Sequence, residues 1–541
     1  MSKAAQQRKA QDMAQAIDQE DKKSLVLYHI AERCRPSSEF SILRSIGEAL
    51  QQGKTLTASI ITGGKTNYSY KVFVKEEPHL AVYSKISFSF ALWNPDRSVE
   101  YDTERTVNEF AMMEYFADLM KDEDQLPVAR PLFLVDVTLP DGALAKLVAT
   151  EWASVDEQWG TQFQDGHADP RVVTKVARAL AKLNLQPITD TNFNDNVRPT
   201  VKTLIGVMKG TFAELLDTVE ARRDGDYAMQ IMRKMGVHKY NHLQDVCYRK
   251  YNEVREVLCH NDSHAFNILV APKPAGGGFA ESDHFILCDW EQAIPGEAGK
   301  DAGLFNLFPI ICALCHAVQG HEQEARHLLQ CTIDFWDEYA HVLKRDGHKD
   351  ESYLCHAFKG AMGVFACYGT ACYMLHVLDE LYPLEGVSPE KDFRAREAFG
   401  AVSFKFLEMA HAEEYDTMDY ESLRIYYKDT ITWYMDELLH NVSDVTVMPR
   451  RSSSLRRQGR RVSDAAILED IQEYRRMSSI VEQSPSFSSS EDTPCSSLEA
   501  FRRESCESEL ETVHLESAEF RFSGISLDTD AREWLTSVEE Y

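Results

Sequence analysis

Three polar side chains lie close together in the sequence, each at the end of a short apolar run. Asp262 and Asn267 are five positions apart in a loop after the apolar run 257–259, and Asp289 directly follows a second apolar run, 285–288. Two acidic groups and one amide, presented by neighbouring strand ends, are the set that phosphoryl transfer from Mg-ATP requires. In that chemistry Asp262 would accept or orient the proton of the attacking hydroxyl. Asn267 and Asp289 would hold Mg²⁺ against the phosphates.

The order of these residues resembles that of a known group of enzymes. An H-x-D-x-x-x-x-N sequence from His260 to Asn267 is followed by the D-x-E of Asp289 and Glu291, as in the aminoglycoside phosphotransferase and choline/ethanolamine kinase superfamily. The spellings HND and Asp-Trp-Glu resemble the small-molecule branch, because a protein kinase would show HRD and DFG. The resemblance implies a two-lobed, protein-kinase-like α+β fold, with a small antiparallel-sheet N-lobe and a larger, mainly helical C-lobe. It also makes His260 part of the catalytic loop.

The loop that would hold the nucleotide phosphates is expected upstream. Strand patterns flank the small polar turn GGKTN at residues 63–67, which is suited to lying over phosphates. The spelling resembles the nucleotide loop of choline and ethanolamine kinases. That resemblance assigns Gly63, Gly64 and Asn67 to nucleotide binding.

A lysine and a glutamate are expected to complete the nucleotide site. Lys85 lies near the end of the next apolar run, where a kinase-like fold places the lysine that contacts the ATP phosphates, and Lys71 is the alternative. The acidic partner should come from the helix predicted over residues 102–120, where Glu109 is preferred to Glu104. The apolar stripe predicted for that helix consists of Val107, Phe110, Ala111, Met113 and Phe116.

The boundary between the lobes is expected near residue 155. Backbone groups at the hinge of kinase-like folds bind adenine, so the resemblance implies this role for Glu151 and Ala153. An amphipathic pattern predicts a first long C-lobe helix over residues 170–185. The GKDAG sequence around Asp301 resembles the family's G-x-D-x-G, in which the aspartate braces the catalytic loop and starts a helix.

Four regions follow from these assignments. The predicted boundaries are an N-terminal polar arm (1–37), a nucleotide-binding N-lobe (38–155), a helical C-lobe with the catalytic and metal loops (156–441), and a regulatory tail (442–541). Within the C-lobe, residues 199–256 are interpreted as an insertion. The later C-lobe helices are predicted over residues 322–343, 362–381, 393–412 and 415–439.

The tail differs in composition from the rest of the chain. Seven of the fourteen residues from Ser484 to Ser497 are serine, and the region has few aromatic residues and no sustained apolar period, so it is predicted to be disordered. Arg-Arg-x-Ser sequences suit a basophilic Ser/Thr kinase, which is the partner predicted for the tail. Four such sequences end at Ser453, Ser463, Ser478 and Ser505.

Composition limits the classes of partner. The chain has 541 residues, with 58 Lys and Arg against 86 Asp and Glu, a formal net charge of −28 that disfavours nucleic-acid binding. The N-terminal residues are polar and show no secretory signal. The most apolar stretches, 304–318 and 360–375, are shorter than the ~20 residues of a spanning helix, so no transmembrane segment is predicted. The 12 scattered cysteines fit reduced thiols and a cytoplasmic protein.

The sequence leaves the hydroxyl substrate open. Choline or ethanolamine, and hence a role in phospholipid biosynthesis, is the first interpretation, with Glu291 facing a cationic ammonium group. Methylthioribose kinases share the Asp-Trp-Glu spelling, so a methylthioribose-kinase-like or another sugar- or aminoglycoside-type phosphotransferase is the alternative. A catalytically inactive kinase fold that serves as a scaffold regulated by phosphorylation is an interpretation of a different class.

Overall fold

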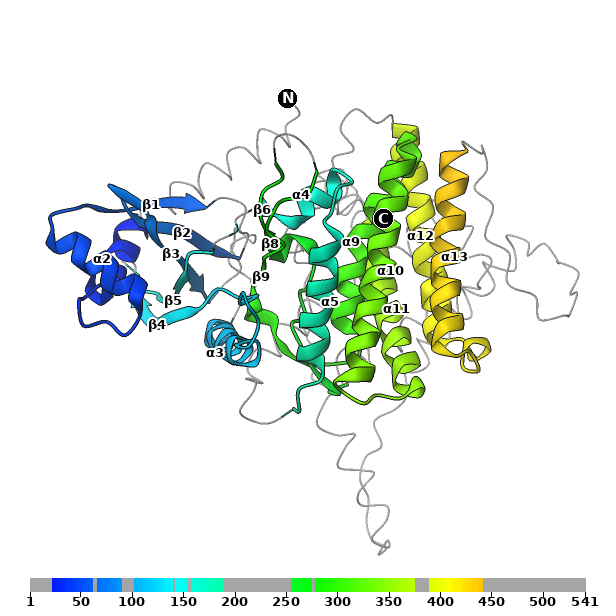
Figure 1. Ribbon diagram of the computed structural model, residues 1–541, viewed down its shortest axis with the longest axis horizontal. Coiled ribbons are helices and arrows are strands. Elements are labelled where there is room, and N and C mark those ends of the chain that lie inside the picture. The colour runs from blue at the N-terminus through cyan, green and yellow to red at the C-terminus, as the bar shows by residue number, and fades with distance from the viewer. Residues whose placement is uncertain are drawn as a thin grey trace, which may run out of the picture.

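The structure is a computed structural model in which a small sheet-based lobe and a larger helical lobe lie side by side (Figure 1). It has the mixed helix and antiparallel-sheet architecture that the sequence predicts. The residues that it describes are 22–61, 66–89, 102–139, 142–153, 155, 157–188, 254–274, 278–374 and 389–440. Gly63, Gly64, most of the predicted C-lobe insertion and the whole predicted tail therefore lie outside the described residues.

The N-lobe is built on a five-stranded antiparallel sheet with the order β1-β2-β3-β5-β4. Alternate residues of β3 point to opposite faces. Val82 and Ile86 join the apolar cluster under α2, whereas Lys85, one residue away, faces the other side of the sheet. A helical segment, residues 22–33, packs into the same cluster. The elements are β1 (Leu56–Ile61), β2 (Asn67–Val74), β3 (Glu77–Phe88), β4 (Pro131–Thr138), β5 (Leu144–Glu151) and α2 (Ser41–Gln51).

Helix α3 (Glu104–Leu119) connects the two lobes, and it agrees closely with the helix predicted over residues 102–120. It packs against β4 and β5 in the N-lobe and against η3 (Trp290–Gln292) in the C-lobe. Its buried face differs from the predicted stripe, because Ala111 is exposed and Val107 and Phe110 are only partly buried. The side chains that are buried are Arg105, Thr106, Asn108, Glu109, Met112, Met113 and Phe116.

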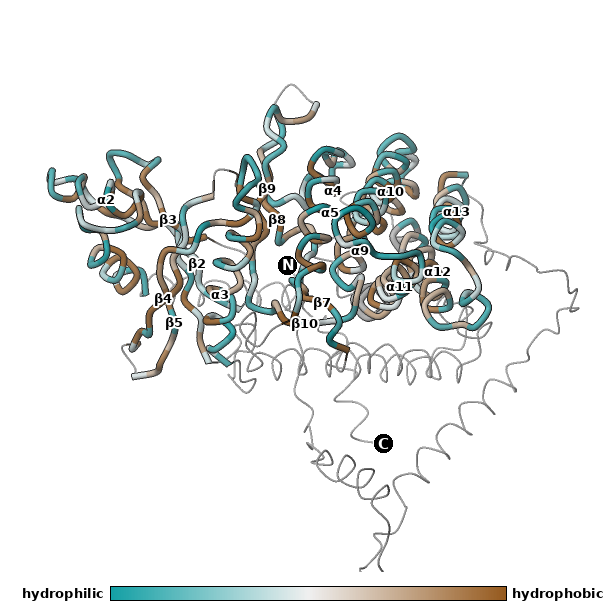
Figure 2. Tube along the Cα trace, turned by 60° about the horizontal axis from the view of Figure 1, so that its bottom comes forward, coloured by the Kyte–Doolittle hydropathy of each residue, from teal (hydrophilic) through white to brown (hydrophobic). Residues whose placement is uncertain are grey.

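The C-lobe packs its helices around α9 (Lys300–Gln319). Helix α5 (Pro170–Asn184) begins where Asp169 accepts a hydrogen bond from the Arg171 N–H and Pro170 occupies the first turn, which are favourable N-terminal residues. Figure 2 shows hydrophobic stretches where the C-lobe helices face one another and hydrophilic stretches on their outer sides. The remaining helices are α4 (Trp159–Gln164), α10 (Glu322–Arg345), α11 (Glu351–Met374), α12 (Pro389–His411) and α13 (Tyr420–Leu439).

Helix α9 is, among the described helices, the one whose length and apolar composition would allow it to cross a membrane. In this structure 94% of that apolar window is buried, and α9 packs against α10, α11, α12 and α13. The helix therefore has the surroundings of a core helix, as the sequence predicts for residues 304–318.

Two small antiparallel sheets hold the loops between the lobes. One pairs β7 (Val257–Cys259) with β10 (Ile294–Gly296), and the other has the order β6-β8-β9. Because β8 and β9 are adjacent, the loop that precedes β8 and the turn that follows β9 lie at the same end of the sheet. The second sheet consists of β6 (Glu157–Gln158), β8 (Ile268–Val270) and β9 (Phe285–Leu287), and the short helix η2 (Ala265–Asn267) precedes β8.

Candidate active site

The loop that follows β7 is bound through its backbone to the buried carboxylate of Asp301. Asp301, in the first turn of α9, accepts hydrogen bonds from the backbone N–H groups of His260 and Asn261, each at 2.9 Å. The Asn184 side chain donates to the same carboxylate at 3.2 Å. Asn261 adopts a left-handed backbone conformation (φ 66°), which is uncommon for a residue other than glycine, so the loop depends on these contacts for its shape.

Asp262 projects from this loop and is paired with Asn267. The Asn267 side-chain amide donates to the Asp262 carboxylate at 3.0 Å and to its carbonyl oxygen at 2.9 Å. The Asp262 side chain remains 18% exposed, and His264 Nε2 lies 3.5 Å from its Oδ1 atom. Burial raises the pKa of Asp262 to about 6. The carboxylate is therefore oriented by neighbours and still open to a substrate, as a group that accepts a proton must be.

His260 lies in the loop after β7, as predicted, and its side chain points into the interior. The side chain is fully buried, its Nε2 lies 2.9 Å from the Cys288 carbonyl oxygen, and the Asp262 N–H points at its Nδ1 at 3.3 Å. Burial lowers the pKa of His260. His260 thus braces the loop against the end of β9. Its buried ring supports a positioning role, and a direct catalytic role stays a prediction.

Asp289 lies at the end of β9, close to the Asp262 loop. Its backbone is left-handed (φ 63°), and its side chain is 34% exposed. The Cys288 N–H donates to the Asn267 carbonyl oxygen at 2.8 Å, which brings Asp289 and Asn267 to the same region. Lys85 Nζ lies 2.7 Å from Asp289 Oδ1. Asp289 therefore stands between the Asp262 loop of the C-lobe and the lysine of the N-lobe.

The structure brings Lys85 and Glu109 together, at 3.0 Å. Burial by itself would lower the pKa of Lys85, but the carboxylates of Asp289 and Glu109 raise it well above its ordinary value, so the side chain is charged. The alternatives lie elsewhere. Lys71 is over the Trp152 ring at 4.1 Å, and Glu104 pairs with Lys146 at 3.4 Å.

Glu291 and Asn67 are bound to each other rather than open to ligands. Glu291 is 3% exposed and accepts from the Asn67 amide at 2.9 Å. Lys85 and Arg105 lie 3.2 and 3.4 Å from the same carboxylate oxygen, and these two cations disfavour the predicted contact with a substrate ammonium group. Asn67 also accepts from Arg105 at 3.0 Å, so the oxygen and the nitrogen of its side-chain amide both have partners within the protein.

The two hinge residues lie where the chain passes from β5 into the C-lobe. The Glu151 N–H donates to the Arg130 carbonyl oxygen at 2.9 Å, and the Glu151 carbonyl oxygen accepts from the Thr150 hydroxyl at 3.0 Å. Ala153 is partly buried. Adenine binding by this segment stays a prediction.

The donor atoms fit a magnesium site completed by phosphates. Asn267 uses its amide nitrogen for Asp262, so its side-chain oxygen is the atom that would face a cation. Within the described residues no group of three His, Cys, Asp or Glu side chains has metal-binding geometry. The protein would therefore supply Asp289 and Asn267, and the nucleotide and water would supply the remaining oxygens, as is usual for Mg²⁺.

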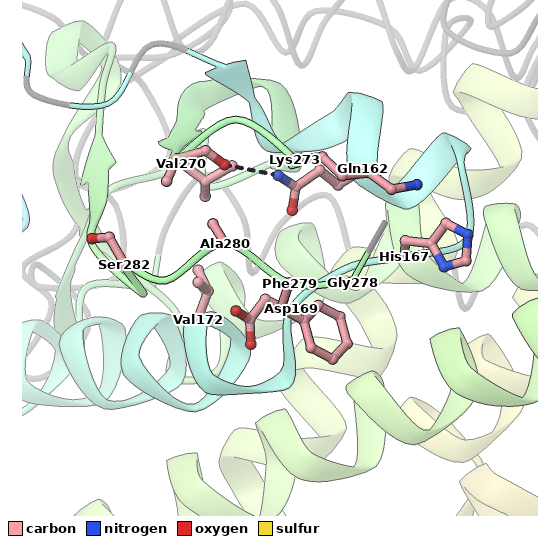
Figure 3. A pocket seen from close by; sticks show the side chains of 11 residues that line it. Gln162, His167, Asp169, Val172, Val270, Lys273, Gly278, Phe279, Ala280 and Ser282 are labelled. Atoms are coloured by element: carbon pink, nitrogen blue, oxygen red, sulfur yellow. Dashed lines mark hydrogen bonds between the residues drawn. The ribbon is translucent and has the colours of Figure 1, made fainter. Parts of the chain in front are cut away.

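A separate pocket of about 280 Å³, part of it open solvent, lies beside α4 and α5 (Figure 3). Its wall includes Gln162, whose amide donates to the Ala271 carbonyl oxygen at 3.0 Å, and Asp169, which caps α5. No residue predicted for the active site lines this pocket. It therefore adds nothing to the site between the lobes.

Three residues near the site, Arg105, Asn108 and His264, were not predicted from the sequence. Arg105 and Asn108 are buried polar residues of α3, and the Asn108 amide donates to the Ala293 carbonyl oxygen at 2.7 Å. They lie at helical spacing with Glu109 and Met112, so a polar stripe on the inner face of the helix was the available signal. His264 stands two residues after Asp262, but nothing in that spacing alone predicts their contact.

A family model and several solved structures are similar to this chain. A model of the phosphotransferase enzyme family matches residues 82–300. A search of curated proteins by sequence found no match. Similar solved structures include glucosamine kinase, with 13% identity, a TM-score of 0.35, and coverage of 67% of this chain and 86% of that one.

Two aminoglycoside phosphotransferases are also among the similar structures. The first is APH(4)-Ia with AMP-PNP and hygromycin B, at 10% identity, a TM-score of 0.32, and coverage of 67% of this chain and 98% of that one. The second is the GDP complex of aminoglycoside 2′-phosphotransferase-IIIa, at 11% identity, a TM-score of 0.33, and coverage of 69% and 100%. The segment from 82 to 300, which is similar to the phosphotransferase enzyme family, holds Lys85, Glu109, Asp262, Asn267 and Asp289.

Proposed function

We propose that this protein transfers the γ-phosphate of Mg-ATP to a hydroxyl group of a small molecule. The observation that carries the proposal is the convergence of Asp262, Asn267, Asp289 and Lys85 between the lobes. The family match supports a phosphotransferase that acts on hydroxyl groups. ATP and Mg²⁺ are the cofactors that this donor set fits.

Each side chain has one task in this reaction. Asp262 receives the proton of the acceptor hydroxyl while the acceptor oxygen forms a bond to the γ-phosphorus and the bond to the β–γ bridging oxygen breaks, so ADP leaves. Asn267 holds Asp262 in position through its amide. Lys85, oriented by Glu109, contacts the phosphates. Bound Mg²⁺ would neutralise phosphate charge, with Asp289 and the Asn267 oxygen as its protein ligands.

The acceptor that we propose is an amino alcohol such as choline or ethanolamine, which would place the enzyme in phospholipid biosynthesis. The HND, GGKTN and Asp-Trp-Glu sequences support this choice. The burial of Glu291 removes one argument for it, because that carboxylate is not open to an ammonium group. A sugar-like acceptor, as in methylthioribose or aminoglycoside phosphotransferases, is the second candidate, since the Asp-Trp-Glu spelling is shared.

The test is the release of ADP by the purified full chain with Mg-ATP and a panel of acceptors. The panel contains choline, ethanolamine, methylthioribose, glucosamine and an aminoglycoside, and each assay is repeated with Asp262→Asn. We expect one acceptor class to raise ADP release above the acceptor-free rate in the wild type and not in the variant. ATP binding without turnover on any acceptor would support the inactive scaffold instead.

The four Arg-Arg-x-Ser serines support a further part of this proposal, in which a basophilic Ser/Thr kinase modifies residues 442–541 in the cytoplasm. Each phosphate adds about −1.5 to −2 charge at neutral pH, so modification would reverse the local basic character of these sequences. Mass spectrometry of the chain isolated from cells tests this directly, and absence of phosphate at all four serines would contradict it.

A further inference from the structure

A buried charge cluster joins the two lobes directly behind the proposed magnesium site. Glu291 lies in η3, two residues after Asp289, and its carboxylate is surrounded by groups from the N-lobe and α3. Asn67 donates to it at 2.9 Å, Thr66 at 3.4 Å, and Lys85 lies at 3.2 Å. Arg105 Nε lies 3.4 Å from Glu291 Oε2. One carboxylate of the metal loop thus contacts three separate elements.

The partners of Glu291 are held by one another as well. The Arg105 guanidinium donates to the Asn67 side-chain oxygen at 3.0 Å and to the Phe88 carbonyl oxygen at 2.9 Å. Arg105, Asn67 and Glu291 are all nearly inaccessible to solvent. Burial of a carboxylate is unfavourable unless it is paired with a cation and hydrogen-bonded. Glu291 has two cations, Lys85 and Arg105, and a hydrogen bond from Asn67. The arrangement is therefore specified by several residues together.

The position of Asn67 connects this cluster to the start of β2, directly after the sequence that is predicted to bind nucleotide. Asn67 is the first residue of β2 and ends the turn at residues 63–67. Its side-chain amide is bound to Glu291 of the metal loop. Lys85, on the neighbouring strand β3, contacts both Glu291 and Asp289.

We propose that Glu291 is a positioning residue that couples the metal loop to the start of β2, through Asn67, and to α3, through Arg105. It acts through these neighbours and does not bind metal or substrate itself, because either ligand would have to displace two cations and an amide. The proposal rests on the proposed function, since it concerns the same nucleotide site. It explains why the acidic group of the Asp-Trp-Glu sequence lies buried beneath that site.

Exchange of the two side-chain types tests the contact. In Asn67→Asp, two carboxylates would face each other at the position of the present hydrogen bond. In Glu291→Gln, the charge beside Lys85 and Arg105 is lost. In the double variant, the amide at 291 can donate to the carboxylate at 67, and Arg105 keeps a carboxylate partner. The double variant therefore restores a donor–acceptor pair with the roles reversed.

The measurement is the Kd of Mg-ATP by calorimetry, together with kcat and KM for ATP. We expect each single variant to weaken the wild-type Kd by about tenfold, with Asn67→Asp the weaker binder, and the double variant to bind about tenfold more tightly than Asn67→Asp. Glu104→Gln, a partly exposed position on the same helix as Arg105 that pairs with Lys146, is the matched control and should keep the wild-type Kd. Thermal unfolding of all variants reports any loss of fold.

Two results would overturn the proposal. One is a double variant whose free-energy change equals the sum of the single changes, because residues in contact do not behave additively. The other is a Glu291→Gln variant with wild-type Mg-ATP affinity. The binding measurement does not depend on turnover, so a wild-type protein that binds Mg-ATP but transfers phosphate to no acceptor would contradict the proposed function and leave this inference open to the same test.

Discussion

The ammonium group of Lys85, in the N-lobe, is surrounded by carboxylates of α3 and of the C-lobe. Three carboxylates, from Glu109, Asp289 and Glu291, lie within 3.2 Å of its ammonium group. Glu109 and Glu291 are buried, whereas Asp289 keeps about a third of its side chain exposed. The carboxylate that remains open is therefore the one at which a cation from solvent would bind, and the two buried ones serve to orient the lysine.

Replacement of Asp262 by Asn removes the group that accepts the proton but keeps the shape of the side chain. We expect kcat to fall by about 10²–10⁴-fold, the usual contribution of a general base. The Kd of Mg-ATP should stay within about twofold, because phosphate binding is assigned to other residues. Steady-state kinetics and calorimetry on the same preparation measure both quantities. Unchanged turnover would remove Asp262 from the role of base.

Asp289→Asn distinguishes the contribution of Mg²⁺ to ATP affinity from the contribution of the direct contacts with the nucleotide. With Mg²⁺ present, ATP affinity should weaken by at least about tenfold, the loss that removal of even an outer-shell partner of a metal causes. Without Mg²⁺, affinity should not weaken, because Lys85 loses a competing carboxylate. Calorimetry with and without Mg²⁺ distinguishes the two conditions. Equal affinity of variant and wild type in Mg²⁺ would show that Asp289 is not a metal ligand.

At the scale of elements, the close approach of α9 and α11 sets the base of the catalytic loop. Gly299 precedes α9 with φ +82°, and a Cβ atom there would lie 1.8 Å from the Ala357 carbonyl oxygen of α11. A Cβ at Gly303 would lie 2.4 Å from the Ala361 carbonyl oxygen. Asp301 lies between these glycines, so the contact of the two helices positions the carboxylate that holds the loop.

Gly299→Ala and Gly320→Ala form a matched pair that tests this packing. Both glycines have a positive φ, but a Cβ at Gly320 would meet nothing within 4 Å. Gly320→Ala should therefore lower the free energy of unfolding by about 1–2 kcal/mol, the cost of the left-handed backbone alone. Gly299→Ala should lower it by about 1–3 kcal/mol more, as overpacking does. Urea unfolding compares the two, and equal losses would contradict the close approach.

His316, near the end of α9, makes the free energy of unfolding depend on pH. Burial lowers the pKa of His316, whose Nε2 lies 3.0 Å from the Gln164 carbonyl oxygen and whose Nδ1 faces His321. The unfolded chain therefore binds a proton at this site more readily than the folded chain. The stabilisation is present above the ordinary pKa of 6.5 and is lost as the pH falls through the lower folded value.

We accordingly expect the free energy of unfolding to fall between pH 7.5 and pH 5.5, and to fall less in His316→Gln. The amide of glutamine can still donate to the Gln164 carbonyl oxygen, so the variant removes the titrating group and keeps a donor. Urea unfolding at both pH values measures the difference. An identical fall in wild type and variant would assign the pH dependence to other groups, among them His321, His167 and Glu324, which lie close by.

At the scale of the whole molecule, the described lobes hold the proposed active site, and the predicted regulatory sequences are those of residues 442–541. We expect truncation after Asn441 to keep the unfolding temperature of the full chain. If the tail restricts substrate access until it is phosphorylated, the truncated and the phosphorylated chains should share a higher kcat/KM than the unmodified full chain. A chain with alanine at all four serines is the control, and equal kinetics in every form would leave recruitment of a partner as the role of the tail.

The sequence by itself predicted several of the elements and the order of the motifs, although α11 begins at Glu351 and not at residue 362. Periodicity predicted α3 and α5 to within two residues, and α10 began where expected, because apolar spacing is a local property. The motifs also predicted the lysine strand, the catalytic loop and the metal loop in the correct order, since each loop directly follows an apolar strand. The fold class followed from the family that these motifs resemble.

Only the tertiary structure decided which side chains meet. The choices of Lys85 over Lys71 and Glu109 over Glu104 depend on the face that a strand or helix turns toward the other lobe, and a residue's neighbours in the sequence do not report this. Glu291 lies two positions from Asp289, yet one is buried against Arg105 and the other is open. The reason is physical: burial and pairing of a charge are determined by groups from distant parts of the chain, which only folding brings together.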